Sequence, residues 1–96
     1  MIQTREDVAA VCSDCEIPSH MWHAVEQYLF DRVPCGGFFM AVVSNDLMGA
    51  FFHADELNGA SMYNWANLLY NEFPAPAWGS PEKVQKWLEQ GKEESQ

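Results

Sequence analysis

The feature that most constrains this chain is a run of fifty residues, 33–82, that contains no Lys or Arg. Most of its side chains are aromatic or aliphatic, and short turn-forming groups interrupt them at 36–37, 44–46 and 78–81. Apolar segments between turn signals predict packed secondary structure rather than disorder. The run therefore indicates a compact domain with an apolar, acid-leaning body, and it restricts the partners that this body can bind.

Length and composition fit one domain. A chain of 96 residues has room for a single core, and 48% hydrophobic residues are ample to fill it. We predict an all-α fold, a compact single-domain bundle of about four to five short helices. The predicted organisation is a capped helix and loop over residues 1–16, a helical core domain over 17–90 and a polar tail over 91–96.

The net charge of −9 comes from fourteen acids and five bases. Proteins that bind nucleic acid or anionic membranes use clusters of Lys and Arg, so we expect neither partner here. No apolar run reaches the ~18–20 residues of a membrane span, and residues 1–7 lack the basic and apolar regions of a signal peptide. Three cysteines, an odd number, argue against a secreted disulfide framework. We therefore expect a cytoplasmic protein with reduced thiols.

Two helices are signalled in the N-terminal third. Thr4 and Asp7 resemble a capping box that opens a short helix. A clearer amphipathic run extends from Met21 to about Arg32, where the following Pro34 disfavours further helix.

Residues 38–43 are all apolar and would suit a buried strand as well as a helix. We favour a helix, because Leu47 and Phe51 continue a four-residue stagger from Phe39 and Val43. Polar residues at 44–46 interrupt that stagger, so we expect a kink there, or a new helix with Asn45 as its N-cap.

A further helix is predicted over residues 59–73, with an unusually wide apolar band. Its main stripe consists of Met62, Trp65, Ala66, Leu69 and Phe73, and a second stripe consists of Tyr63 and Tyr70. Such a band is wider than a surface helix of a small monomer needs. This helix is therefore either central to the fold or meets another subunit, and we expect a homo-oligomer with both tyrosines in the contact.

The last helix has the best signals of all. Ser80 suits the N-cap, Pro81 suits the first helical position and Glu82 complements the helix dipole. Gly91 occupies the position where a glycine that ends a helix belongs.

Metal-ligand residue types come close together at only one place, where Cys12 and Cys15 precede His20 and His23. Only four residues separate the Cys pair from the His pair, whereas zinc fingers place about a dozen there. The four residues are weak candidates for a zinc site, and we expect packed thiols and exposed histidines instead. The same Cys pair lacks the strand-and-helix setting of a redox motif. We expect no metal and no cofactor.

No catalytic set emerges from the spacing. Cys35, His53 and Asp55 supply the residue types of a nucleophile, a base and an orienting carboxylate, but nothing in the sequence brings them together. The adjacent Asp55 and Glu56 point in different directions on a helix, so they do not form an acid–base pair. We expect a protein that is not an enzyme.

One small-ligand site is conceivable from the sequence. Gly36 and Gly37 precede an apolar helix and would present N–H groups to an anion, with Phe38 and Asn45 beside them and Arg32 as the nearest cation. Phosphate-binding loops usually add a Lys, which this segment lacks.

Several strings of this sequence resemble a family of small proteins of unknown activity that are encoded in bacteriophages and prophages. The resemblance covers about three quarters of the chain, from Ile17 to Leu88. The matching strings are Ile17-Pro18-Ser19-His20-Met21, Gly37 to Leu47, Ala54-Asp55, Asn58, Leu69-Tyr70-Asn71-Glu72 and Trp78 to Val84. The resemblance implies a phage gene product that acts in the bacterial cytoplasm, but no catalytic or binding residues. Cys12 and Cys15 lie outside it.

We therefore consider two main functions. The leading hypothesis is a non-enzymatic phage binding protein, a counter-defence or host-takeover inhibitor that occludes a host protein. Its expected binding surface comprises Tyr63, Tyr70, Trp65, Asp55 and Glu56. The alternative is an oligomeric sponge that sequesters a nucleotide immune signal. A structural or assembly role in the phage is a third possibility.

Overall fold

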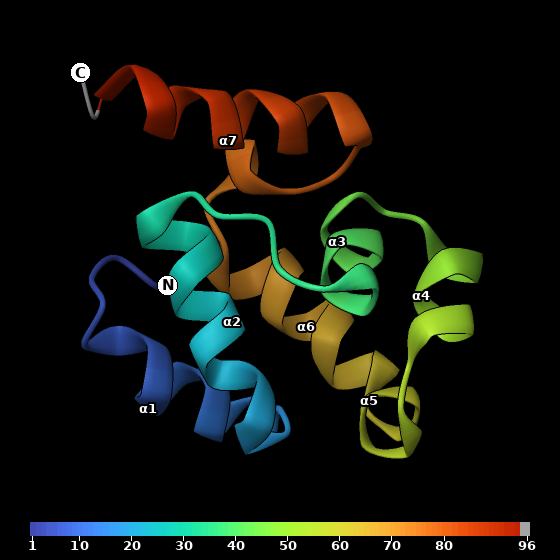
Figure 1. The fold of residues 1–96 in the computed structure, drawn as a ribbon. Coiled ribbons are helices and arrows are strands. Elements are labelled where there is room, and N and C mark those ends of the chain that lie inside the picture. The colour runs from blue at the N-terminus through green and yellow to red at the C-terminus, as the bar shows by residue number, and fades with distance from the viewer. Residues whose placement is uncertain (95–96) are drawn as a thin grey trace.

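The computed structural model describes the backbone of residues 1–94 and the side chains of residues 1–91. Within that part of the chain the fold is all-helical, in agreement with the predicted class, and it contains no strand (Figure 1). It has seven α-helices, more than the four to five predicted. They are α1 (Asp7–Asp14), α2 (Trp22–Glu26), α3 (Gly37–Val43), α4 (Leu47–His53), α5 (Glu56–Ala60), α6 (Met62–Glu72) and α7 (Pro81–Glu94).

Three short helical turns complete the described fold. A 3₁₀ turn, η1 (Ser19–Met21), leads into α2, and a π-helical turn, η2 (Gln27–Asp31), continues it. A second 3₁₀ turn, η3 (Ala75–Ala77), joins α6 to α7. The helix number exceeds the prediction for two reasons. The break expected at residues 44–46 separates two helices, α3 and α4, and the single helix predicted over 59–73 is replaced by α5 and α6.

The start of α1 differs in detail from the predicted capping box. The Asp7 carboxylate accepts hydrogen bonds from the backbone N–H groups of Gln3 and Thr4, both at 3.0 Å. The reciprocal bond, from a backbone N–H of the first turn to the Thr4 hydroxyl, is not formed. The helix begins at Asp7, and no side chain caps it. Val8 and Cys12 then anchor this helix in the core.

The amphipathic helix predicted to end near Arg32 does end there. Arg32 adopts a left-handed conformation with φ of 56°, which stops the helix before Pro34. Val25, Tyr28 and Leu29 lie on the buried face. The Tyr28 hydroxyl donates to the Ala77 carbonyl oxygen at 2.6 Å, so this helix is tied to the segment that follows α6.

Residues 38–43 form a helix, as favoured, and the break after it lies where the polar residues predicted it. Asn45 is not the N-cap of the next helix, because its left-handed backbone, with φ of 62°, ends the preceding turn instead. The cap is Asp46, whose carboxylate accepts a hydrogen bond from the Gly49 N–H at 3.0 Å. A change of direction between α3 and α4 results.

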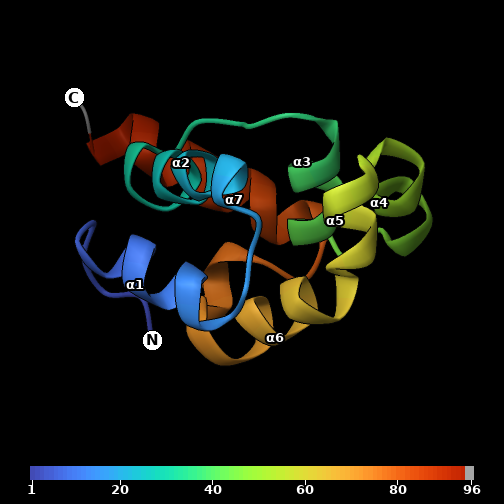
Figure 2. The same ribbon diagram turned by 90° about the horizontal axis from the view of Figure 1, so that it is seen from below.

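Helix α6 lies against α2 and α3, and the aromatic core is formed between them (Figures 1 and 2). Trp65 is fully buried and makes edge-to-face contacts with Phe38 and Phe39, at centroid distances of 5.6 and 5.9 Å. Phe39 makes a further edge contact with Tyr28 at 5.2 Å. The central position predicted as one alternative for this helix is therefore correct.

Helix α7 crosses one end of the molecule and is held there by an aromatic clasp formed by Tyr28, Arg32 and Trp87 (Figure 1). The guanidinium of Arg32 stacks 3.6 Å from the centre of the Trp87 ring and donates to the Trp87 carbonyl oxygen at 2.8 Å. The Trp87 indole N–H donates to the Tyr28 carbonyl oxygen at 3.1 Å.

The predicted helix end at Gly91 is wrong, because α7 continues to Glu94. A Cβ added at Gly91 would overlap the Cβ and Cγ of Arg32. The glycine therefore permits close packing rather than a left-handed turn. Of the predicted polar tail, residues 95 and 96 lie outside the described residues.

The predicted N-cap of α7 is confirmed, because the Ser80 hydroxyl accepts a hydrogen bond from the Lys83 N–H at 3.2 Å. Replacing Ser80 with alanine should lower the free energy of unfolding by about 1 kcal/mol. Urea unfolding of the wild type and S80A measures this difference. Ser80→Asp, which restores an acceptor and complements the helix dipole, should recover most of the loss; equal loss in both variants would contradict the capping role.

Candidate functional site

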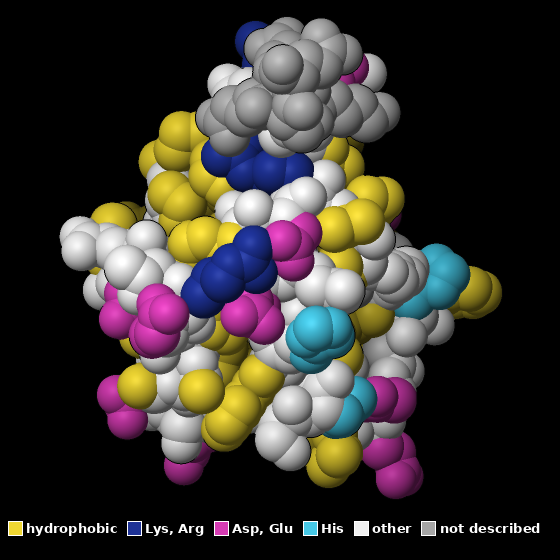
Figure 3. Space-filling view, turned by 60° about the vertical axis from the view of Figure 1, so that its left-hand side comes forward, with side chains coloured by type: hydrophobic (Ala, Val, Ile, Leu, Met, Phe, Trp, Pro, Cys, Tyr) yellow, Lys and Arg dark blue, Asp and Glu magenta, His cyan; other side chains and the backbone are white. Residues whose placement is uncertain are grey.

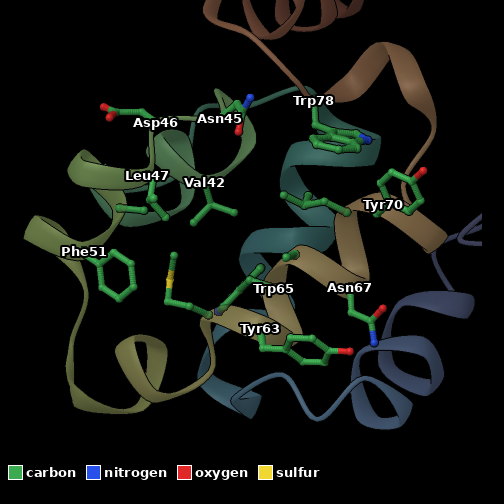
Figure 4. Close-up of a pocket in the computed structure, with 14 residues that line it drawn as sticks. Val42, Asn45, Asp46, Leu47, Phe51, Tyr63, Trp65, Asn67, Tyr70 and Trp78 are labelled. Atoms are coloured by element: carbon green, nitrogen blue, oxygen red, sulfur yellow. The ribbon is translucent and has the colours of Figure 1, made fainter.

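An open groove lies between α4 and α6, with Val42 of α3 also in its lining (Figure 4). It has a volume of about 520 Å³. It is lined by Val42, Asn45, Asp46, Leu47, Ala50, Phe51, Met62, Tyr63, Trp65, Ala66, Asn67, Leu69, Tyr70 and Trp78. We call this set of residues the α4–α6 groove.

The groove is apolar, and its few polar groups lie toward its edges. Asn45 and Asp46 come from the turn before α4, and Asn67 comes from α6 (Figure 4). The Asp46 carboxylate points away from the groove and is held by the Gly49 N–H. No Lys or Arg is among the lining residues, because both walls belong to the base-free run.

Helix α4 leaves an unusual amount of apolar surface uncovered. Leu47, Met48, Phe51 and Phe52 are 62%, 76%, 51% and 84% exposed, although Ala50 on the same helix is buried. A helix of seven residues with one buried side chain gains little from its own packing, so its exposed face is not explained by the core. Contiguous exposed apolar side chains are characteristic of a site that binds another molecule.

The predicted surface tyrosines lie at this groove. Tyr63 and Tyr70 are each 80% exposed and stand two turns apart on the same helix, at the groove edge (Figure 4). Their exposure agrees with the predicted surface, and their contact with a second subunit stays a prediction. Trp65 was wrongly assigned to that surface, because its ring is fully buried between α3 and α6 and reaches the groove only as part of its floor.

Asp55 and Glu56 are exposed at the start of α5 and are not among the residues that line the groove. Asp55 caps α5 by accepting a hydrogen bond from the Asn58 N–H at 2.7 Å, and it also bonds the His20 ring at 2.9 Å. Asn58 is buried and its side-chain oxygen accepts a hydrogen bond from the Trp65 indole at 3.3 Å. A surface carboxylate is thus connected to the central aromatic core through one buried amide.

This capping role predicts an acid sensitivity. The Asn58 N–H, and then His20, hold the pKa of Asp55 below its ordinary value, which is about 3.9. A carboxyl with a lowered folded pKa stabilises the fold above its unfolded pKa, and the contribution is lost as pH falls through the folded pKa. Asp55→Asn, which cannot titrate, should therefore lose less thermal stability than the wild type between about pH 4 and pH 2.

Melting temperatures measured over that pH range test the expectation. His20→Gln is the matched comparison, because it removes the second cause and keeps the bond from Asn58. It should retain most of the acid sensitivity, and an identical pH profile for the wild type and D55N would show that Asp55 does not contribute.

The structure does not assemble the ligand site expected from the sequence. Gly36 is the N-cap of α3 with φ of 43°, and the Gly37 backbone lies against the His53 ring, which a Cβ there would meet at 3.2 Å. Phe38 is buried in the core, and Asn45 belongs to the α4–α6 groove. Arg32 is used in the clasp with Trp87. Long-range packing disperses residues that are near in sequence.

The weak metal candidates are also dispersed. Within the described residues no group of three Cys, His, Asp or Glu side chains is placed to hold a metal ion. Cys12 is buried, and burial raises the pKa of its thiol to about 12, so it lies in the core as an unreactive thiol. His20 and His23 are exposed. His20 bonds Asp55, and the Nδ1 of His23 lies 3.7 Å from a carboxylate oxygen of Glu26.

The residues considered for catalysis make other contacts in the described structure. The Cys35 thiol donates to the carbonyl oxygens of Ala24 at 3.5 Å and Val33 at 3.3 Å. Asp55 bonds His20 rather than His53. Burial raises the pKa of the Cys35 thiol, which is the opposite of what an activated nucleophile requires.

Sequence reasoning missed the α4 wall of the groove, in particular Leu47 and Phe51, and it missed Trp78. The available signal was the apolar density of residues 47–52, which exceeds what one short helix can bury. Across residues 1–94, none of the helices combines the length and the apolar character that crossing a membrane requires.

Comparison of this chain with models of protein families, with curated proteins and with solved structures finds no match.

Proposed function

We propose that this chain is a non-enzymatic binding protein that holds an apolar segment of a partner protein in the α4–α6 groove. The observation that supports this most directly is the uncovered apolar face of α4 beside a groove of about 520 Å³. Leaving such side chains in water costs free energy, about 25 cal/mol per Å² of apolar surface, which a bound partner would recover. Two exposed tyrosines at the edge fit an interface, where tyrosine is enriched.

The resemblance suggests the class of partner. If the chain is a phage or prophage product, the partner is a host protein of the bacterial cytoplasm, and occlusion of its surface by the groove is the mode of inhibition. A binder of this kind needs no catalytic group, and its specificity depends on the shape and polarity of the groove.

A site-specific photo-crosslink tests this proposal. Ala66 is exposed, lies on α6 and lines the groove, so p-benzoylphenylalanine at this position should capture the partner from a lysate of the bacterial host. The same label at the exposed Ala9, on α1, is the matched control. Crosslinks of equal yield from both positions, or none from position 66, would contradict the proposal.

Ala66→Arg serves as the unlabelled competitor that should fail to displace the crosslinked protein from its partner. A long charged side chain placed in the groove should remove partner binding, because the guanidinium would have to be desolvated against apolar walls. Excess unlabelled wild type should suppress the crosslink, and excess A66R should not. Ala9→Arg adds the same charge elsewhere and should compete as well as the wild type. Both variants should keep the wild-type stability within about 0.5 kcal/mol.

A second candidate function, a sponge for a nucleotide immune signal, is favoured by the aromatic rings of Trp78 and Tyr70, on which a base could stack. The lining argues against it, because no Lys or Arg is present to hold phosphates and Asp46 lies at the edge. A thermal-shift screen with cyclic dinucleotides compares the two. A ligand that binds with a micromolar Kd would raise the free energy of unfolding by about 2.7 kcal/mol at a ligand concentration a hundredfold above that Kd. We expect no such stabilisation.

A further inference from the structure

Resting on the proposed function, we infer that the segment held in the α4–α6 groove is an amphipathic α-helix whose apolar face is flanked by Lys or Arg. The inference has three parts, which concern the backbone of the segment, the spacing of its anchors and the charge of the groove.

In the described structure the groove has no row of backbone groups along which an extended backbone could pair. Its walls are side chains of α4 and α6, two helices. The described residues form no strand, so no sheet edge is available for strand addition. A peptide backbone placed against apolar walls must therefore satisfy its own hydrogen bonds, which an α-helix does.

The exposed edge of α6 fits such a helix. Tyr63 and Tyr70 are seven residues apart on the same face, which is about 10 Å along the axis, and Ala66 between them leaves space above the floor. A helix that lies along α6 would place apolar side chains at positions i, i+3 or i+4, and i+7 between the two tyrosines. Leu47 and Phe51, one turn apart on α4, form the opposite wall (Figure 4).

Within the described part of the chain, the one charged residue that lines the groove is an acid, Asp46, which lies at the end formed by the turn before α4. Two further acids, Asp55, which pairs with His20, and Glu56, begin α5, the short helix that joins α4 to α6 (Figure 1). Figure 3, which shows the side of α1 and α2, has Lys and Arg side chains in the middle and upper parts of the view.

Three of the five bases are also occupied. Arg5 pairs with Asp31 and Glu26, Arg32 stacks on Trp87, and the Lys83 ammonium donates to the Ala75 carbonyl oxygen. Among the described residues that line the groove, Asp46 is the one charged residue and no base is present. The chain as a whole has a net charge of −9, so a partner helix with basic flanks has the complementary charge.

A second copy of this chain is a poorer occupant. A two-fold contact brings the same patch of both copies together, so it would place the acids of one groove near those of the other. Each copy also carries a net charge of −9. The homo-oligomer predicted from the tyrosines is consequently kept as an outcome of the test.

Two synthetic helical peptides of about eighteen residues provide the test. Both carry the same Leu and Ala face, and one has Lys and the other Glu at every flanking position. Fluorescence anisotropy should show that the Lys peptide binds at least about tenfold more tightly than the Glu peptide, and that added salt weakens its binding.

Variants assign that binding to the groove. A66R should weaken binding of the Lys peptide at least about tenfold, whereas A9R, with the same change in net charge, should leave it within about twofold. Asp46→Asn keeps a capping side chain and removes a charge, so binding of the Lys peptide to this variant should depend less on salt concentration. If A66R proves unstable, Tyr70→Ser, at an 80% exposed position, replaces it.

Three results would overturn the inference: equal binding of the Lys and Glu peptides, equal weakening by A66R and A9R, or a wild-type dimer in sedimentation that A66R converts to monomer. These outcomes are separate from failure of the proposed function. A crosslink from position 66 to a non-helical or acidic segment of a host protein would retain the function and reject the helix, whereas absence of any groove-specific crosslink would reject the function itself.

Discussion

Trp65→Ala should destabilise this protein more than any other single truncation, by about 3–5 kcal/mol. The Trp65 ring is fully buried and contacts the edges of Phe38 and Phe39, so its removal leaves a cavity where α3 and α6 meet. The change also removes the indole donor to the side-chain oxygen of Asn58, which is itself buried. A small domain has about 5–15 kcal/mol of stability in total, so W65A should be close to unfolded.

Urea unfolding followed by circular dichroism measures this loss. Tyr63→Ala is the matched control, because it truncates an aromatic side chain of the same helix that is 80% exposed. It should change the free energy of unfolding by no more than about 0.5 kcal/mol. Similar losses in Y63A and W65A would mean that the two faces of α6 are wrongly assigned.

Gly91→Ala should lower the free energy of unfolding by about 1–3 kcal/mol. On an exposed helix this substitution would stabilise the protein by about 1 kcal/mol, because alanine has the higher helix propensity. Here the added Cβ overlaps the Arg32 side chain, so α7 has to move away and the stack of Arg32 on Trp87 is weakened. The sign of the effect therefore distinguishes close packing from simple helix propensity.

A double-mutant cycle with Arg32→Gly isolates the contact. Arg32 has a left-handed backbone, which glycine adopts without cost, and the glycine removes the atoms that a Cβ at position 91 would meet. In the R32G background, G91A should cost much less than in the wild type, with a coupling of at least about 1 kcal/mol. Additive effects would show that Gly91 and Arg32 do not touch.

The groove and the clasp lie on different parts of the molecule, and this separation is useful for interpreting variants. Changes at Gly91 or Arg32 should alter stability and leave the affinity of the folded protein for its partner unchanged. Changes at Ala66 should do the reverse. The base-free run supplies both walls of the groove. The surface where we propose that binding occurs therefore lacks Lys and Arg among its lining residues.

Local chemistry accounts for the features that could be predicted from the sequence. The all-helical class, the helix over 38–43, the end of a helix at Arg32 and the cap by Ser80 all depend on periodicity or on residues within one turn of each other. Errors of detail arose where two neighbouring residues had similar capping ability. Asn45 and Asp46 are such a pair, and only the backbone conformation shows which of them bonds Gly49.

The sequence by itself determined the fold class and the acidic and base-free character of the body, and it grouped Tyr63 and Tyr70 on one stripe of their helix. Only the tertiary structure decided that Trp65 is buried, that Arg32 and Gly91 fasten α7, and that Leu47, Phe51 and Trp78 meet the tyrosines around one groove. The physical reason is distance along the chain. Periodicity shows that a helix has an apolar face, but which face is covered depends on contacts between residues tens of positions apart, and those contacts leave α4 uncovered.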